Sequence, residues 1–98
     1  MHLVNSGRVI FRRHAWERME SRGISVSDVL HVLAFGEQIE QYPDDTPFSS
    51  ALMLARVRER PLHVVAARDA PNDVTYVVTA YEPDSNEWDP EFKRRRAP

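Results

Sequence analysis

The chain has 98 residues, which is enough for one compact domain with a single hydrophobic core. Its 42% hydrophobic and 29% charged residues are typical of a globular protein and argue against intrinsic disorder. It has no cysteine, no apolar run long enough to span a bilayer and no signal-peptide pattern in its first ten residues. We therefore predict one cytoplasmic domain over residues 1–98, with a core at about 8–92, a basic tail at 93–98 and no disulfide.

The formal net charge of −2 argues against a basic nucleic-acid binder of the usual kind. The positive charges gather in Arg8–Arg22 and Lys93–Arg96, whereas Glu37–Asp45 is acidic, so we expect one positive face. All but one of the 13 basic residues are arginines, whose planar fork binds phosphate or carboxylate through paired hydrogen bonds.

The first half of the chain predicts a short strand and two helices. The partly apolar stretch Arg8–Phe11 indicates an edge strand, and a helix follows over about Arg13–Arg22 until the next glycine ends it. Ser25 and Asp28 have the spacing of a capping box, and apolar residues at helical spacing then continue to Gly36. The second helix is therefore expected to pack on an apolar surface.

The second half predicts extended segments separated by turn-rich loops: Glu37–Tyr42, Ala51–Val57, Leu62–Arg68 and Val74–Tyr81. Short connections favour an antiparallel meander. We predict an α+β fold in which two N-terminal helices pack on one face of a three- to four-stranded antiparallel sheet, and the other face is left for a cleft.

The polar segment Glu82–Pro98 contains Trp88 and Phe92, which are large apolar side chains. We expect these two residues to hold the tail against the sheet. The basic run Lys93–Arg96 is either a phosphate contact or a solvated tail.

The best indication of function is a ridge on the first helix. His14, Arg18 and Arg22 follow one another at every fourth position, so they are surface neighbours, and a phosphate would fit beside them. The alternatives are that His14 caps the helix, and that the arginines lay their stems over the core and pair with nearby glutamates.

Two residues of the predicted sheet are further candidates. His63 has apolar neighbours in its strand, so it is either a core histidine with satisfied hydrogen bonds or a residue of the uncovered face. The register of the following hairpin would place it level with Val78, or with Thr79 or Val77 after a one-residue shift. Tyr81 either donates a hydrogen bond or stacks on a base, or is a packing residue at the strand end.

No metal or cofactor site is expected. There is no phosphate-binding glycine loop, and no histidine has an i, i+4 histidine or carboxylate partner of the kind that zinc sites use. The scattered histidines are His2, His14, His31 and His63.

Several short motifs follow one another between Phe11 and Arg95: F-x-x-H-A-x-E-R-M-x-x-R-G-I-S, G-E-x-I-E-x-Y, R-P-L-H-V-V, T-A-Y-x-P-D and W-x-P-x-F. In this order they resemble the prokaryotic domain-of-unknown-function family numbered 4258, which is similar to RelE-like and barnase-like ribonucleases. The resemblance implies an α+β fold and a toxin encoded beside a zinc-finger or helix-turn-helix antitoxin. The positions that carry the pattern are His14, Arg18, Arg22, His63, Thr79, Tyr81, Trp88 and Arg94 or Arg95.

The main hypothesis is a metal-independent endoribonuclease in which the 2′-hydroxyl of RNA, either free or associated with the ribosome, attacks the adjacent phosphate. This reaction needs a base, an acid and cations around the developing charge. His63 or His14 would serve as base and acid, and Tyr81 would stack or donate a proton. The expected phosphate-binding residues are Arg18, Arg22, Arg94 and Arg95.

Two alternatives remain open. The arginine ridge can dock a partner protein or an acidic ligand in a non-catalytic binding module. The chain can also be a degenerate ribonuclease fold with a regulatory role, which its slightly acidic charge favours because RelE-like ribonucleases tend to be basic.

Overall fold

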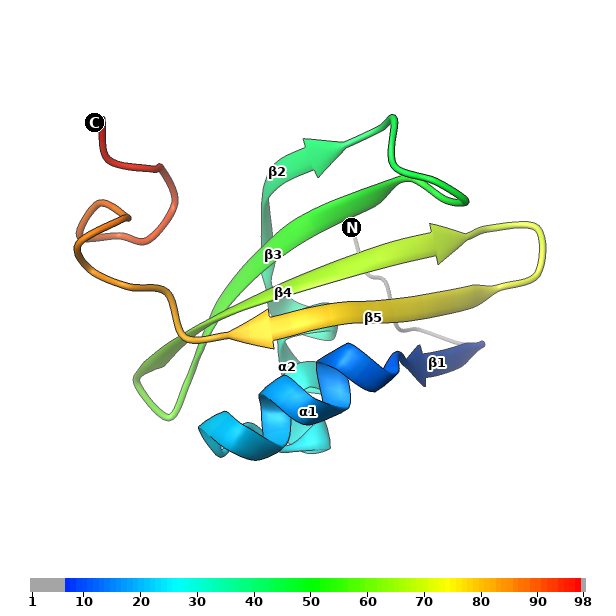
Figure 1. Ribbon diagram of the computed structural model, residues 1–98, viewed down its shortest axis with the longest axis horizontal. Coiled ribbons are helices and arrows are strands. Elements are labelled where there is room, and N and C mark those ends of the chain that lie inside the picture. Colours follow the sequence, from blue (N-terminus) through cyan, green and yellow to red (C-terminus); the bar gives the residue numbers. More distant parts are fainter. Residues whose placement is uncertain (1–6, 98) are drawn as a thin grey trace.

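The computed structural model describes residues 7–97 and confirms an α+β fold with two helices packed on one sheet (Figure 1). Residues 1–6 and 98 of the predicted domain lie outside the described range. No helix in that range is long and apolar enough to cross a membrane. The elements are β1 (Arg8–Phe11), α1 (Arg13–Arg22), α2 (Val26–Phe35), β2 (Glu37–Tyr42), β3 (Ser50–Val57), β4 (Arg60–Asp69) and β5 (Val74–Tyr81).

The sheet has five strands in the order β1-β5-β4-β3-β2, so the prediction of three or four antiparallel strands is wrong in part. Strands β2 to β5 form the expected antiparallel meander, but β1 pairs with β5 in parallel. The reason lies in the position of α1, which follows β1 directly and packs along β5. A backbone hydrogen bond of 3.1 Å from Arg12 to the carbonyl of Val77 fixes this junction.

The helix boundaries agree with the local signals in the sequence. Gly23 ends α1 in the left-handed conformation, with φ of 64°. The Ser25 hydroxyl accepts a hydrogen bond from the Asp28 amide and the Asp28 carboxylate accepts one from the Ser25 amide, which completes the capping box of α2. Gly36 has no room for a side chain, because a Cβ there would lie 2.4 Å from the Val32 carbonyl oxygen. The chain can therefore turn tightly from α2 into β2.

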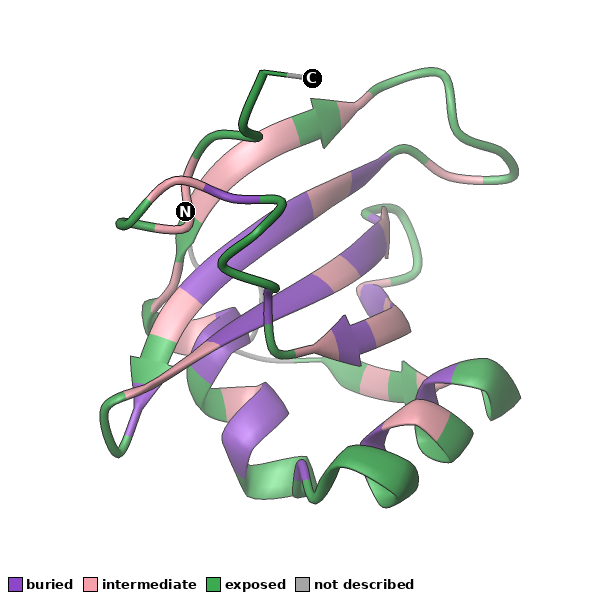
Figure 2. Cartoon of the chain, turned by 60° about the vertical axis from the view of Figure 1, so that its left-hand side comes forward, coloured by how far each residue is buried: buried purple, intermediate pink, exposed green. Residues whose placement is uncertain are grey.

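The hydrophobic core lies between the helices and the sheet. Strands β3 and β4, in the middle of the sheet, are largely buried, whereas α1 is exposed on its outer side (Figure 2). The core residues come from both helices and three strands: Ala15, Met19, Val29, Val32, Leu33, Met53, Leu62, Val64, Ala66, Val77 and Ala80.

The sheet face opposite the helices, here called the tail face, is partly covered by the tail, residues 83–97. Trp88 is only 2% exposed, which confirms that it holds the tail on the sheet. Lys93 and Arg95 form ion pairs with Glu37 and Glu40 of β2. The tail therefore occupies part of the face where a cleft was expected.

Candidate functional site

The register of the β4–β5 hairpin differs from the prediction. His63 lies level with Tyr81, not with Val77, Val78 or Thr79. The difference comes from a loop that pairs the ends of β4 and β5 one residue later than expected, together with a β-bulge at the Val65–Ala66 step of β4. This register places two of the predicted catalytic residues side by side on the tail face.

His63 is fully buried under the tail and both of its ring nitrogens have partners. Nε2 donates to the carbonyl oxygen of Phe92 at 2.8 Å, and Nδ1 accepts from the Tyr81 hydroxyl at 3.2 Å. The ring meets Trp88 edge-on, with 4.5 Å between centroids. Burial lowers the pKa of His63 and raises the pKa of Tyr81, so both groups are held neutral. Of the two interpretations open from the sequence, the core histidine with satisfied hydrogen bonds is the one observed.

His14 does not join His63. It is exposed in the first turn of α1, on the helix side of the sheet, whereas the alternation of β4 turns His63 to the tail face. The structure therefore does not bring the two histidines together as an acid–base pair. His2 lies outside the described range. Within residues 7–97 no three His, Cys, Asp or Glu side chains gather as a metal-binding group.

Three of the predicted site residues do meet in one place. Arg18 and Arg22 of α1 and Tyr81 at the end of β5 line a cleft of about 480 Å³ beside the part of β5 that β1 does not pair with, here called the edge cleft. Among the residues that the structure describes, neither guanidinium forms a hydrogen bond or an ion pair. The other lining residues are the carboxylates Glu82, Asp84 and Glu87.

Arg60 organises the edge cleft, and sequence analysis did not single it out. Its Nε donates to Glu82 at 2.6 Å, and its terminal nitrogens donate to the carbonyl oxygens of Arg22 and Gly23 at 2.7 and 3.0 Å. Arg60 therefore provides hydrogen bonds to the last carbonyl oxygens of α1 and links the α1 side of the cleft to Glu82. No local sequence pattern marks this role, because its partners lie far away along the chain.

The terminal arginines do not reach the edge cleft. Arg95 pairs with Glu40 on β2 and lies over the Trp88 ring, 4.6 Å from its centroid. Arg94 is exposed and lines a different depression, beside Glu37. The predicted phosphate-binding set is therefore divided between two distant parts of the molecule.

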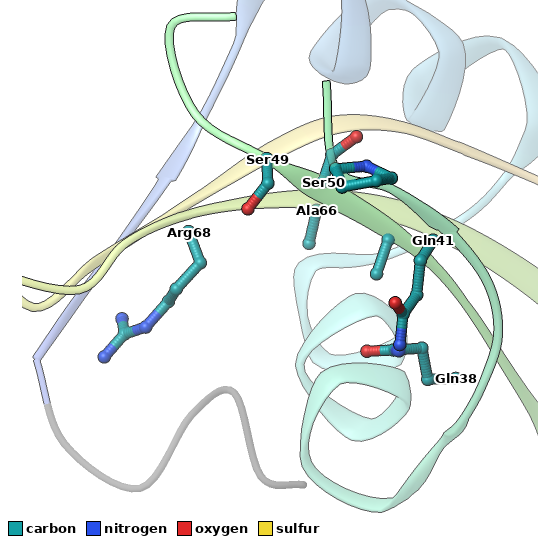
Figure 3. Close-up of a pocket in the computed structure, with 8 residues that line it drawn as sticks. Gln38, Gln41, Ser49, Ser50, Ala66 and Arg68 are labelled. Carbon is teal, nitrogen blue, oxygen red and sulfur yellow. The ribbon is translucent and has the colours of Figure 1, made fainter. Parts of the chain in front are cut away.

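A second cleft of about 230 Å³ lies on the helix side of the sheet (Figure 3). Gln38 and Gln41 lie together on one side of it and Arg68 on the other, with Ala66 between them. The two glutamines share a face because a β-bulge at Ile39 interrupts the alternation of β2. Simple alternation would place the two glutamines on opposite faces, so this cleft was not predictable from the sequence.

Comparison with known proteins identifies a family for this chain. The family described as "Domain of unknown function (DUF4258)" matches residues 11–82, which is a shorter span than the predicted resemblance and excludes the tail. No curated protein and no solved structure matches the chain significantly.

Proposed function

We infer that this chain, which belongs to the DUF4258 family, is a non-catalytic binding module whose edge cleft receives a polypeptide segment of mixed charge. One observation carries the proposal: two unpaired guanidiniums and three carboxylates line the same cleft. A polypeptide can turn acidic side chains to Arg18 and Arg22 and basic ones to Asp84 and Glu87. A nucleic-acid backbone would instead bring its phosphates beside the carboxylates.

The positions of the histidines also support a binding role. General acid–base catalysis needs titrating groups within reach of one substrate. His63 is buried with both nitrogens engaged, and His14 is on the other side of the sheet. Binding through charge complementarity needs neither residue.

The test is an array of short synthetic peptides that combine acidic and basic residues, with all-acidic peptides and a single-stranded RNA oligonucleotide for comparison. We expect mixed-charge peptides to bind best. The double substitution Arg18→Gln with Arg22→Gln should weaken them at least about tenfold, because it removes two charge-assisted contacts. Arg94→Gln, an exposed cation remote from the cleft, is the matched control and should retain the affinity. Tighter binding of RNA, or no effect of the double substitution, would contradict the proposal.

An endoribonuclease, the function implied by the family resemblance, is the second candidate. The proximity of carboxylates, guanidiniums and the Tyr81 phenol in the edge cleft favours it. In this reaction Glu87 would take the proton of the 2′-hydroxyl, whose oxygen would bond to the phosphorus and form a 2′,3′-cyclic phosphate. Arg18 and Arg22 would surround the phosphate, and the 5′-oxygen would leave with a proton from solvent water. A neighbouring gene for a small zinc-finger or helix-turn-helix protein would favour a toxin.

Induced expression in a bacterial host separates the two candidates. Growth arrest with RNA cleavage by the wild type, but not by the Arg18→Gln, Arg22→Gln variant, would establish the ribonuclease and overturn the binding module. Intact RNA and normal growth would leave the binding module. His63→Ala is unsuitable here, because it removes a buried side chain and so tests folding.

A further inference from the structure

The outer side of α1 carries an exposed tryptophan. Trp16 is 47% exposed, and its ring rests on Phe11 with 4.8 Å between centroids. It forms one wall of a groove of about 270 Å³ that runs between α1 and the start of α2. Exposed apolar grooves with an aromatic wall are typical of interaction sites. The groove is lined by Trp16, Met19, Glu20, Ile24, Ser25 and Val26.

Opposite charges stand at the two ends of this surface. Arg13, Trp16 and Glu20 are spaced i, i+3, i+7, so they form one stripe along α1, here called the Trp16 stripe. All three are exposed. Within residues 7–97, Arg13 and Glu20 take part in no ion pair. The stripe therefore offers a positive end, an apolar centre and a negative end.

We propose that the Trp16 stripe is the interface of a homodimer, in which two α1 helices pack antiparallel about a two-fold axis near Trp16. This arrangement sets Arg13 opposite Glu20 of the partner subunit, and Glu20 opposite Arg13 of the partner subunit. The two Trp16 rings meet at the centre, where each can enter the groove of the other chain. When two identical stripes pack antiparallel, the positive end of each faces the negative end of the other. Such a surface suits a second copy of the same chain.

The interface is independent of the edge cleft. Arg18 and Arg22 line the edge cleft at the end of β5, whereas Trp16 and Glu20 of the stripe line the groove beside α2. A failure of peptide binding in the edge cleft would therefore leave the dimer proposal standing, and the reverse also holds.

Sedimentation equilibrium of the full chain tests the dimer, with circular dichroism to verify that each variant is folded. We expect the wild type to dimerise reversibly. Arg13→Glu alone and Glu20→Arg alone each place like charges opposite one another, and each should raise the dissociation constant at least about tenfold. Trp16→Ala should weaken association at least as much. Glu17→Gln, an exposed carboxylate beside the stripe, is the matched control and should not weaken it.

Mixing the two charge variants gives the decisive result. One Arg13→Glu chain and one Glu20→Arg chain have both opposing pairs complementary again, so an equimolar mixture should form a heterodimer although each variant alone is mostly monomeric. A wild type that stays monomeric up to millimolar concentration would overturn the proposal. A dimer whose dissociation constant is unchanged by the single charge reversals would also overturn it. An equimolar mixture of the two variants that does not associate would do the same.

Discussion

The imidazole of His63 joins the tail to the sheet through two hydrogen bonds that require opposite roles of its nitrogens. Nε2 must carry the proton to donate to the Phe92 carbonyl, and Nδ1 must be bare to accept from Tyr81. Only one neutral tautomer meets both conditions. Protonation would remove the acceptor on Nδ1. Burial disfavours the charged imidazolium and lowers the pKa of His63.

This residue predicts a pH-dependent stability. Because the pKa of His63 is lower in the folded chain than its ordinary value of 6.5, its contribution is fully present above that value and is lost as the pH falls through the lowered pKa. We expect the free energy of unfolding of the wild type to decrease on acidification over this range. His63→Phe, which cannot titrate, should show a smaller decrease.

Urea denaturation of the wild type and of His63→Phe at neutral and mildly acidic pH measures the effect. His14→Gln, which replaces an exposed histidine, is the control. An unchanged pH dependence in His63→Phe would show that another group is responsible.

At the scale of the element, α2 depends on a single buried carboxylate at its first turn. Burial raises the pKa of Asp28, but hydrogen bonds from the Ser25 amide and hydroxyl and from Arg58 outweigh burial, so the pKa lies below its usual value. The Arg58 guanidinium donates to Asp28 at 3.0 Å from the turn between β3 and β4. One side chain thus caps the helix and connects it to the sheet.

We expect Asp28→Ala to lower the free energy of unfolding by about 2 kcal/mol, because it removes a capping-box partner and leaves backbone and guanidinium donors without their acceptor. Asp44→Ala, an exposed carboxylate in a loop, should change stability by less than about 0.5 kcal/mol. Thermal or urea denaturation of the two variants gives both values. Equal effects of the two substitutions would contradict the role assigned to Asp28.

The helices and strands whose ends are marked by local sequence signals were predictable. The features that depend on which strands pair, and in which register, were not. Gly23 and the Ser25–Asp28 capping box marked the helix ends, and turn residues separated the four strands of the meander. The parallel partner of β1 had no signal, because a four-residue strand does not specify its neighbour. Neither bulge in β2 and β4 contains a glycine that would have indicated it.

The candidate site was also predictable only where single residues, and not contacts between distant segments, define it. Arg18, Arg22 and Tyr81 were selected from the sequence one by one, and the packing of α1 along β5 brings them to one cleft. The carboxylates of that cleft and the role of Arg60 were missed, because they depend on contacts between distant segments. The separation of His14 from His63 was not predictable, because sequence alone does not decide which face of the sheet a strand residue occupies.

At the scale of the whole molecule, the tail completes a second layer on the sheet, although it lies outside the part of the chain that matches the family. The buried Trp88 ring packs edge-on against the His63 ring, with 4.5 Å between centroids. We expect Trp88→Ala to lower the free energy of unfolding by about 3–5 kcal/mol, because it leaves a large cavity on the tail face.

Urea denaturation of Trp88→Ala measures this loss. Phe35→Ala is the matched control, since that aromatic side chain is 73% exposed and its removal creates no cavity. A loss below about 1 kcal/mol for Trp88→Ala would mean that the domain is complete without its tail.

The parallel pairing of β1 with β5 has a consequence for how the chain folds during synthesis. Strand β1 cannot pair until β5 has been synthesised, because its hydrogen-bonding partners, Val74–Val77, leave the ribosome only after most of the domain. Until then the outer edge of β4 is unpaired, and such an edge is open to association with other nascent chains. Helices α1 and α2, which need only local contacts, can form early and cover the apolar side of the growing sheet while it waits for its final strand.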